Sequence, residues 1–421
     1  MTWEMVPLAE LGTWTGGGTP SKSRPDYWDG EIPWLSPKDM GSLVLADTQD
    51  HISTTAVAES STKLVPAGAV AIVTRSGILE HTLPSTYVPF DVTLNQDMKA
   101  LAPRAGVDPK WVLYGLRAFE RQILSNCRKA GTTVASIELR RLENFRIPVP
   151  SLAEQRRIVE LVEEHLSHLD AADASLGQAK HRVSSLIDNV LTTWRERNTT
   201  AMTPLGAIAS TQLGKMLDAK KASGQPVPYL ANINVRWGEF DLRDLRTVLL
   251  TEPEREKFSL QRGDLLLCEG GEPGRGAVWK GEVSNIAFQK ALHRVRVSAP
   301  DRWRPEYVAA MIREGIRRHR WDHLFTGTTI KHLPQEKLRL LEIPEVSLEQ
   351  QDVLLNKVDG LEAHVAQLQQ SVTMNQQRSA LLRRAVLAAA FSGRLTGSPS
   401  DTEVIEESAA NLAPHGSEEL Q

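Results

Sequence analysis

Residues 131–155 read GTTVASIELRRLENFRIPVPSLAEQ and residues 327–351 read GTTIKHLPQEKLRLLEIPEVSLEQQ, so one stretch occurs twice, without a gap, at an offset of 196 residues. Each copy runs from a Gly-Thr-Thr loop through a short amphipathic segment to Ile-Pro and Ser-Leu, and a long helical pattern follows. Such a repeat indicates a tandem duplication. Its simplest architecture is two homologous domains, each followed by one helix.

Both helical patterns carry seam residues at steps of three and four, which is the spacing of a coiled coil. The second seam runs for 32 residues from Val358 to Ala389, or ~48 Å at 1.5 Å per residue. Because two complementary seams lie in one chain, we expect the two helices to pack on each other as an antiparallel pair. His165 and Asn375 also fall on the seams and are interpreted as polar residues that set the register. The expected helix-pairing residues are Val162, Leu169, Leu176, Val183, Val190, Val358, Leu361, Val365, Leu368, Val372, Leu382 and Val386.

The predicted fold class is α+β, with two homologous mixed α/β domains separated by two long antiparallel coiled-coil helices in a pseudo-two-fold internal repeat. The boundaries follow from the repeat. We predict a first domain at 1–150, a first spacer helix at 151–198, a second domain at 199–346, a second spacer helix at 347–396 and an acidic disordered tail at 397–421.

Composition narrows the function only weakly. The net charge of −3 alone argues against a nucleic-acid partner, but residues 401–421 hold six acidic residues and no Lys or Arg, so residues 1–400 carry +3. A weakly positive body is compatible with DNA binding. No apolar run approaches 18 residues and the start lacks a signal-peptide pattern, so we expect no membrane span and a cytoplasmic protein. The two cysteines, Cys127 and Cys268, are expected to be buried, inert thiols.

The motifs of common catalytic sites are missing from the sequence. It contains no Gly-x4-Gly-Lys-Ser/Thr phosphate loop, no Asn-Pro-Pro-aromatic tetrad of amino-methyltransferases, no His-Glu-x-x-His and no Cys-x-x-Cys. A nuclease-like trio of Asp26, Asp97 and Lys99 is interpreted as chance, because such residues are common. We therefore expect no catalysis, no metal and no cofactor in this chain, and any chemistry in a partner.

Polar residues follow predicted strands at corresponding places in the two domains. Buried strands are predicted at 68–73 and 263–268, and polar stretches follow them at 74–77 and 269–276. The domains thus share a framework and differ at the loop tips, as expected of a scaffold that reads two different ligands. A basic cluster, Arg313, Arg317, Arg318, His319 and Arg320, is either a solvated face or a phosphate contact.

Over nearly the whole chain except its tail, these residues resemble the specificity subunits of type I restriction-modification enzymes. The segments that carry the resemblance are, in order, Gly17-Gly18-Thr19-Pro20-Ser21, Tyr27-Trp28, Ile32-Pro33-Trp34, Gly263-Asp264-Leu265-Leu266, Glu269-Gly270-Gly271, both Gly-Thr-Thr segments, both Ile-Pro…Ser-Leu…Gln stretches, and residues 381–387 and 390–395. The resemblance implies a non-catalytic subunit whose two target-recognition domains each read one half of a bipartite double-stranded DNA site. It also implies two methyltransferase subunits docked on the helices, and restriction subunits that translocate and cut.

On this hypothesis the loop tips supply the DNA contacts, with Arg, Asn and Gln suited to bases and Lys and Thr mostly to phosphates. The candidates in the first domain are Ser21, Lys22, Ser36, Lys38, Arg75, Gln96, Thr132 and Thr133. The candidates in the second domain are Lys215, Asn232, Asn234, Arg236, Arg275, Gln289, Thr328, Thr329 and Lys331.

Two other classes of protein stay open at this point. One is a coiled-coil scaffold that joins proteins without reading DNA sequence. The other is a self-sufficient nuclease or methyltransferase, which the missing motifs disfavour. Divergent loop tips on a repeated domain favour the specificity subunit.

Overall fold

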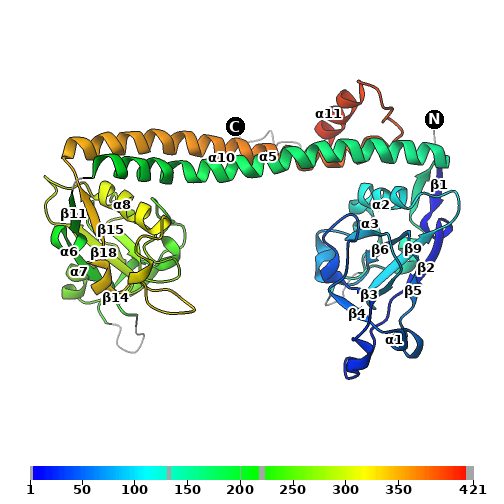
Figure 1. The fold of residues 1–421 in the computed structure, drawn as a ribbon, viewed down its shortest axis with the longest axis horizontal. Coiled ribbons are helices and arrows are strands. Elements are labelled where there is room, and N and C mark those ends of the chain that lie inside the picture. The colour runs from blue at the N-terminus through cyan, green and yellow to red at the C-terminus, as the bar shows by residue number, and fades with distance from the viewer. Residues whose placement is uncertain (1–2, 130–133, 200, 218–222, 414–421) are drawn as a thin grey trace. The chain divides into compact units, whose positions relative to one another are not determined.

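The computed structural model describes residues 3–129, 134–199, 201–217 and 223–413 (Figure 1). The chain divides into two compact units. The first unit holds residues 1–176 and 374–421, and the second holds residues 177–373. Each unit therefore combines one α/β domain with parts of both long helices.

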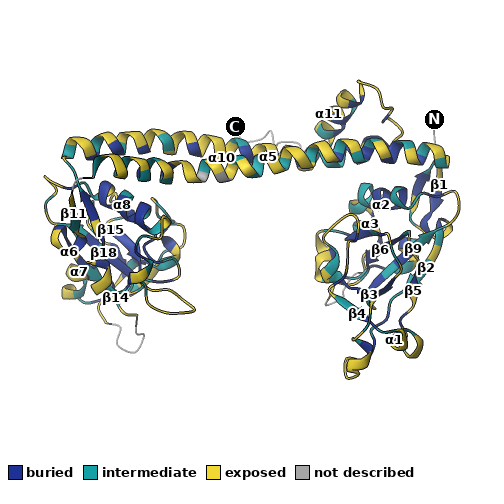
Figure 2. Ribbon diagram, viewed as in Figure 1, coloured by how far each residue is buried: buried dark blue, intermediate teal, exposed yellow. Residues whose placement is uncertain are grey.

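The domain of the first unit contains two four-stranded sheets. The first sheet is antiparallel throughout and has the order β2 (Gly12–Gly16), β9 (Met98–Pro103), β6 (Ala69–Val73) and β7 (Ser85–Val88). The second sheet has the order β4 (Asp50–Ile52), β3 (Ile32–Leu35), β8 (Val92–Leu94) and β5 (Leu64–Val65), with β3 and β8 parallel. The predicted strand at 68–73 is confirmed as β6. All five of its residues are buried, as Figure 2 shows for the strands in the middle of the domain.

Helices and a strand ribbon complete this unit. Strand β1 (Glu4–Pro7) pairs antiparallel with β10 (Arg146–Val149), which directly precedes the first long helix. Asp108 caps helix α2 (Pro109–Ala118) by accepting from the backbone N–H groups of Lys110 and Trp111. The remaining helices are α1 (Thr54–Glu59), α3 (Glu120–Cys127) and α4 (Leu139–Glu143).

The domain of the second unit has the same framework. Its larger sheet has the order β12 (Ala209–Leu213), β18 (Leu292–Val297), β15 (Leu265–Cys268) and β16 (Gly276–Val278). Its smaller sheet has the order β14 (Arg246–Leu250), β13 (Gln225–Leu230) and β17 (Ala287–Phe288), and its ribbon pairs β11 (Ala201–Pro204) with β19 (Glu342–Glu345). Its helices are α6 (Leu205–Ile208), α7 (Glu252–Phe258), α8 (Pro305–Arg317) and α9 (Gln335–Leu338). The parallel pair of β13 and β17 repeats that of β3 and β8. The predicted internal repeat is thus a repeat of structure.

The two long helices are α5 (Leu152–Asn198) and α10 (Leu348–Phe391). In the first unit Asp170 and Asp173 of α5 bind Arg383 of α10, and Asp173 also accepts from Ser379. In the second unit Ile187 and Leu191 of α5 share a core with Leu354, Val358 and Val365 of α10. The partner positions descend along α10 as they ascend along α5. Within each unit the helices are therefore antiparallel, as predicted, and the predicted fold class is confirmed.

The predicted seam residues differ in their burial. Val162, Val358, Val365, Val372 and Val386 are buried, and Leu169, Leu176, Val183, Val190, Leu361 and Leu382 are partly buried. Leu368 is 47% exposed, so its placement in the seam was wrong. Asn375 is exposed as well, so it does not act as a buried polar residue of a seam. Toward the end of α5 the buried residues are Ile187 and Leu191 and not the predicted Val190, because α8 also packs against this turn of the helix.

The acidic tail also differs from its prediction. Residues 401–412, expected to be disordered, form helix α11 (Asp401–Leu412), whose Ile405 is buried in the core of the first unit. Asp401 accepts hydrogen bonds from the backbone N–H groups of Thr396 and Gly397, at 2.9 and 2.6 Å, before the helix begins. The acidic composition of this segment suggested disorder, although the segment also contains an amphipathic stripe at helical spacing. The stripe comprises Val404, Ile405, Ser408, Ala409 and Leu412.

One fully buried glutamine ties each long helix to its own domain. Gln155 Oε1 accepts from the backbone N–H of Asp108 at 2.9 Å, and its Nε2 donates to the carbonyls of Gly106 and Pro150. Gln351 repeats these bonds with the N–H of Arg304, at 2.8 Å, and with the carbonyls of Arg302 and Val346. Each side chain thus binds the segment before α2 or α8 and the chain leading into its own helix.

Removal of either glutamine should loosen only its own unit. Gln155→Ala removes a fully buried side chain that pairs with the N–H of Asp108 and two carbonyls, and the loss of such bonds costs about 1–3 kcal/mol. We expect hydrogen exchange to accelerate in peptides around 106–112 for Gln155→Ala and around 302–308 for Gln351→Ala. Gln376→Ala, at an exposed position on α10, is the matched control and should change neither region. Equal acceleration in both regions for either variant would contradict this assignment.

Candidate nucleic-acid interface

Five segments meet at one end of the sheets in the first unit, and we call them the first loop cluster: residues 17–22, 36–38, 74–76, 95–97 and 134–137. Backbone hydrogen bonds fix their order. The N–H of Gly18 donates to the carbonyl of Leu94 at 2.8 Å, and the N–H of Asn95 donates to that of Leu35 at 2.8 Å. Further bonds of the same kind join Thr74 to Asp97 at 2.8 Å and Ser76 to Ala135 at 3.0 Å.

The second unit has a corresponding second loop cluster: residues 214–217, 231–236, 269–276, 289–291 and 326–333. Lys215 donates its N–H to the carbonyl of Phe288 at 2.9 Å, and Gln289 donates to that of Leu230 at 3.0 Å. Similarly, Glu269 donates to Ala291 at 2.9 Å and Leu333 donates to Glu269 at 2.7 Å. In both units, therefore, residues that follow the Gly-Thr-Thr segment in sequence adjoin the chain that leaves the central strand.

A close approach of two segments recurs in the clusters and requires glycine. A Cβ on Gly17 would lie 1.9 Å from the carbonyl oxygen of Asn95, and one on Gly214 would lie 2.3 Å from that of Gln289. Only a residue without a Cβ lets the loop after β2 or β12 come so near the neighbouring turn. The sequence signal of three glycines at 16–18 thus reflects packing of the framework.

Most candidates of the first unit point their side chains to solvent. Ser21, Lys22, Lys38, Arg75 and Gln96 are exposed. Ser36 is buried, and its hydroxyl donates to Asp39 at 2.9 Å where it caps the short helix η3 (Pro37–Asp39). Ser36 therefore shapes the loop and offers no free group to a ligand. Thr132 and Thr133 lie outside the described residues.

Several candidates of the second unit are engaged within the protein. Asn234 is buried in the short helix η5 (Asn232–Asn234), where it accepts from the N–H of Ala231 and donates to the carbonyl of Asp241. Asn232 Nδ2 donates to the carbonyl of Gly270 at 3.0 Å. The Arg275 side chain is only 18% exposed, and its guanidinium binds Glu272 at 3.0 Å. These three residues hold the loops in shape.

The remaining candidates of this unit differ in exposure. Lys215 is ion-paired with Glu254, and this hydrogen bond holds the pKa of Glu254 below its usual value. Gln289 is half-buried. The exposed polar candidates are Arg236, Thr328, Thr329 and Lys331.

A buried histidine that the sequence did not point to supports the second loop cluster. His293 is fully buried and burial lowers its pKa, so the imidazole stays neutral at pH 7. Its Nε2 lies 2.8 Å from the carbonyl of Leu333, which directly follows the Gly-Thr-Thr loop. A neutral imidazole with Nε2 protonated donates here and fixes that end of the loop.

The basic cluster at the end of α8 is partly engaged within the second unit, although Arg317, Arg318 and His319 are exposed. Arg313 binds Asp188 of α5 at 2.9 Å, and Arg318 binds Thr192 and Asn189 of α5. Glu314, fully buried, pairs with both Arg195 of α5 and Arg320. Arg313, Glu314 and Arg318 thus fasten the end of α8 to the last turns of α5, and the periodicity of Asp188, Thr192 and Arg195 on α5 is the sequence signal for it.

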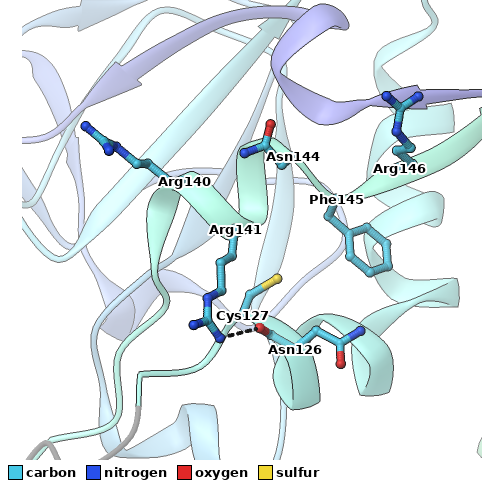
Figure 3. A pocket seen from close by; sticks show the side chains of 7 residues that line it. All are labelled: Asn126, Cys127, Arg140, Arg141, Asn144, Phe145 and Arg146. Carbon is cyan, nitrogen blue, oxygen red and sulfur yellow. Dashed lines mark hydrogen bonds between the residues drawn. The ribbon is translucent and has the colours of Figure 1, made fainter.

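The described residues of the first unit also contain a basic hollow of about 440 Å³ between α3, α4 and β10 (Figure 3). Arg140, Arg141 and Arg146 line it, and Figure 3 shows their guanidinium groups turned away from one another. Arg141 is bound to the carbonyl of Asn126 at 3.3 Å. Because the three charges do not converge, this hollow is not an anion site.

Among the described residues, no three His, Cys, Asp or Glu side chains gather in a group that could hold a metal ion. None of the helices described is long and apolar enough to cross a membrane. Cys127 and Cys268 are buried and unpaired, as predicted, and burial raises the pKa of both thiols.

Comparison with known proteins shows which proteins the chain resembles. Residues 1–174 match the family model described as type I restriction modification DNA specificity domain. The chain is 46% identical to the specificity subunit of the type I restriction enzyme EcoR124I/EcoR124II of Escherichia coli over 38% of this chain and 40% of that subunit, so less than half of that relative is spanned. It is 23% identical to the StySPI specificity subunit of Salmonella potsdam over 73% of this chain and 70% of that one.

Solved structures extend the likeness of fold over almost the whole chain. A chain from a structure of a type I R-M system, concerned with complex assembly and conformational transition, superposes with a TM-score of 0.72 at 16% identity, covering 94% of this chain and 98% of that one. The HsdS subunit of Thermoanaerobacter tengcongensis gives a TM-score of 0.53 at 17% identity, covering 93% and 97%. The chain is thus similar to type I restriction-modification specificity subunits, by sequence mainly over residues 1–174 and by fold over nearly its whole length.

Removal of the buried charge on α8 should weaken the second unit. Glu314→Ala removes the buried carboxylate that pairs with Arg195 and Arg320, and the loss of one member of such a group costs about 3–5 kcal/mol. Urea unfolding of the full chain should show this loss in the transition that exposes the second unit. Glu256→Ala, at an exposed position on α7, should shift stability by less than about 0.5 kcal/mol. If both variants shift stability equally, the ion pairs of Glu314 do not hold α8 on α5.

Proposed function

We propose that this chain is the DNA-reading subunit of a type I restriction-modification complex, and that each loop cluster reads one half of a bipartite double-stranded site. The observation that carries the proposal is the repeated framework with different tips. The same backbone hydrogen bonds gather the same five segments in both units, while the side chains they present differ. A shared scaffold with divergent tips suits two different half-sites.

The exposed and the engaged candidates take different parts in this reading. Arg75 and Gln96 are exposed in the first unit and can pair with base edges, whereas Lys22 and Lys38 suit phosphates. In the second unit Arg236, Thr328, Thr329 and Lys331 are the exposed groups. The engaged side chains of Ser36, Lys215, Asn232, Asn234 and Arg275 hold the loops that carry these groups.

The long helices have two roles in the proposal. The lengths of α5 and α10 set the separation of the two half-sites. A helix rises 1.5 Å per residue and one DNA turn is ~34 Å, so the length of a helix can be compared with a distance along the duplex. Their outer faces dock two methyltransferase subunits. Leu368 and Val353 of α10, 47% and 59% exposed within the second unit, supply apolar contacts for one of them.

Chemistry belongs to the partners in this scheme. The methyltransferase subunits modify adenine and restriction subunits translocate and cut, while this chain binds no cofactor and supplies sequence choice. We place the complex in the cytoplasm, where its DNA substrate lies.

Modified bases in the source genome test the proposal directly. We expect deletion of the gene to remove methylated adenines from one split motif with a fixed gap, as read by single-molecule sequencing. Replacement of residues 1–150 by the matching domain of a relative should change one half of that motif and leave the other. Survival of every modified motif after deletion would count against DNA reading. Capture of helix-bound partners would then examine the scaffold alternative.

Salt dependence separates phosphate contacts from structural charges. Binding that releases counterions gives a slope of log K against log salt of about −0.9 per phosphate contact, so Lys22→Ala and Lys38→Ala should each make the slope shallower by about 0.9. The measurement is titration of the complex with duplex carrying the motif at several salt concentrations. Lys357→Ala, at an exposed position on α10, is the control. An unchanged slope for both variants would remove these lysines from the interface.

A further inference from the structure

Five exposed apolar side chains stand in the described parts of the loop clusters. In the second unit Ile233 is 70% exposed, Ile330 and Met216 are each 59% exposed and Leu217 is 44% exposed, and in the first unit Val134 is 43% exposed. Among the described residues no other large apolar side chain is as exposed as Ile233. Single exposed aliphatic residues are ordinary, but two or more gathered on loops that meet at one place indicate a contact surface.

The backbone brings the two isoleucines of the second unit to neighbouring loops. Ile233 is the middle residue of η5, and Asn232 beside it donates to the carbonyl of Gly270. Gly270 in turn forms a β-bridge with His332, two residues beyond Ile330. Reciprocal bonds between Thr326 and His332, at 2.8 and 2.9 Å, close the loop whose tip carries Ile330.

Hydrogen bonds hold the backbone around both isoleucines in place. The side chain of Asn234 holds η5 through bonds of 2.9 Å to the N–H of Ala231 and to the carbonyl of Asp241. The loop of Ile330 is fixed at its end by buried His293. An isoleucine has a stiff χ1 torsion, so little conformational entropy is lost when such a side chain meets a partner.

The repeat offers an internal comparison. Ile330 corresponds to Val134, because both follow Gly-Thr-Thr at the offset of 196 residues. Ile233 corresponds to Lys38, because both are the middle residues of the short capped helices η5 and η3. The second unit therefore places an aliphatic group where the first unit places a charge suited to phosphate.

From this geometry we infer that Ile233 and Ile330 form an apolar contact for the C5-methyl group of thymine in the major groove. The inference rests on the proposed function and adds the chemistry of one half-site. The half-site read by the second unit contains at least one A·T pair, which is recognised through the thymine methyl group. In the major groove the thymine methyl is the only apolar feature on a base edge, and aliphatic side chains recognise it by contact.

Deoxyuridine isolates this contact, because it differs from thymidine only by the missing methyl. The full chain, with the methyltransferase subunits that co-purify with it, is titrated with duplex carrying the motif found in the genome, with each thymine replaced in turn by deoxyuridine. One replacement in one half-site should weaken binding about fourfold, as expected for burial of one methyl group. Ile233→Ala and Ile330→Ala should weaken binding to the thymine duplex and lose most of this discrimination.

The matched control is Leu340→Ala, which truncates an exposed aliphatic side chain outside the loop cluster and should keep the full fourfold discrimination. The inference is overturned if every replacement is tolerated by the unaltered chain, or if both isoleucine variants still discriminate fully. In either case the loss of the motif on gene deletion would leave the proposed function standing. If the complex shows no preference for any motif, the proposed function fails and this inference fails with it.

Discussion

The structure depends on one repeated interaction, the buried glutamine at the start of each long helix. Gln155 and Gln351 are fully buried, and each side chain binds one backbone N–H and two carbonyls. Buried backbone groups must be paired, so these two side chains complete the bonding of both the domain and the start of its helix. The direction in which each helix leaves its domain follows from that requirement.

The hydrophobic core of each unit is completed by a helix that begins in the other half of the sequence. In the first unit the ring of Phe391, at the end of α10, stacks on Trp111 of α2 with 4.3 Å between centroids. In the second unit Trp194, near the end of α5, meets Tyr307 of α8 edge to face at 5.7 Å. Neither domain has a complete core without the helix that follows the other domain.

The residues that support the loops differ from the residues that are exposed at the loop tips. The polar groups of Asn234, Arg275 and His293 bind loop backbone or neighbouring side chains. The exposed positions can therefore change without loss of the fold. Position 38 is lysine and its counterpart at 233 is isoleucine, although both sit in the same capped turn. That separation is how one framework can present a charge in one unit and an apolar surface in the other.

The sequence by itself determined the repeat, the class of fold, the buried strands and the pairing direction of the helices, because periodicity and duplication are properties of the chain alone. It could not tell an exposed polar residue from one engaged within the protein. Ser36 and Lys38 were equal candidates for DNA contact, and only the folded structure buries Ser36 against Asp39 and leaves Lys38 exposed. Only tertiary structure decided that the arginines of α8 fasten α5, that acidic residues 401–412 form a packed helix, and that Ile233 and Ile330 stand exposed. The physical reason is that burial and pairing depend on contacts between distant residues, which local spacing does not record.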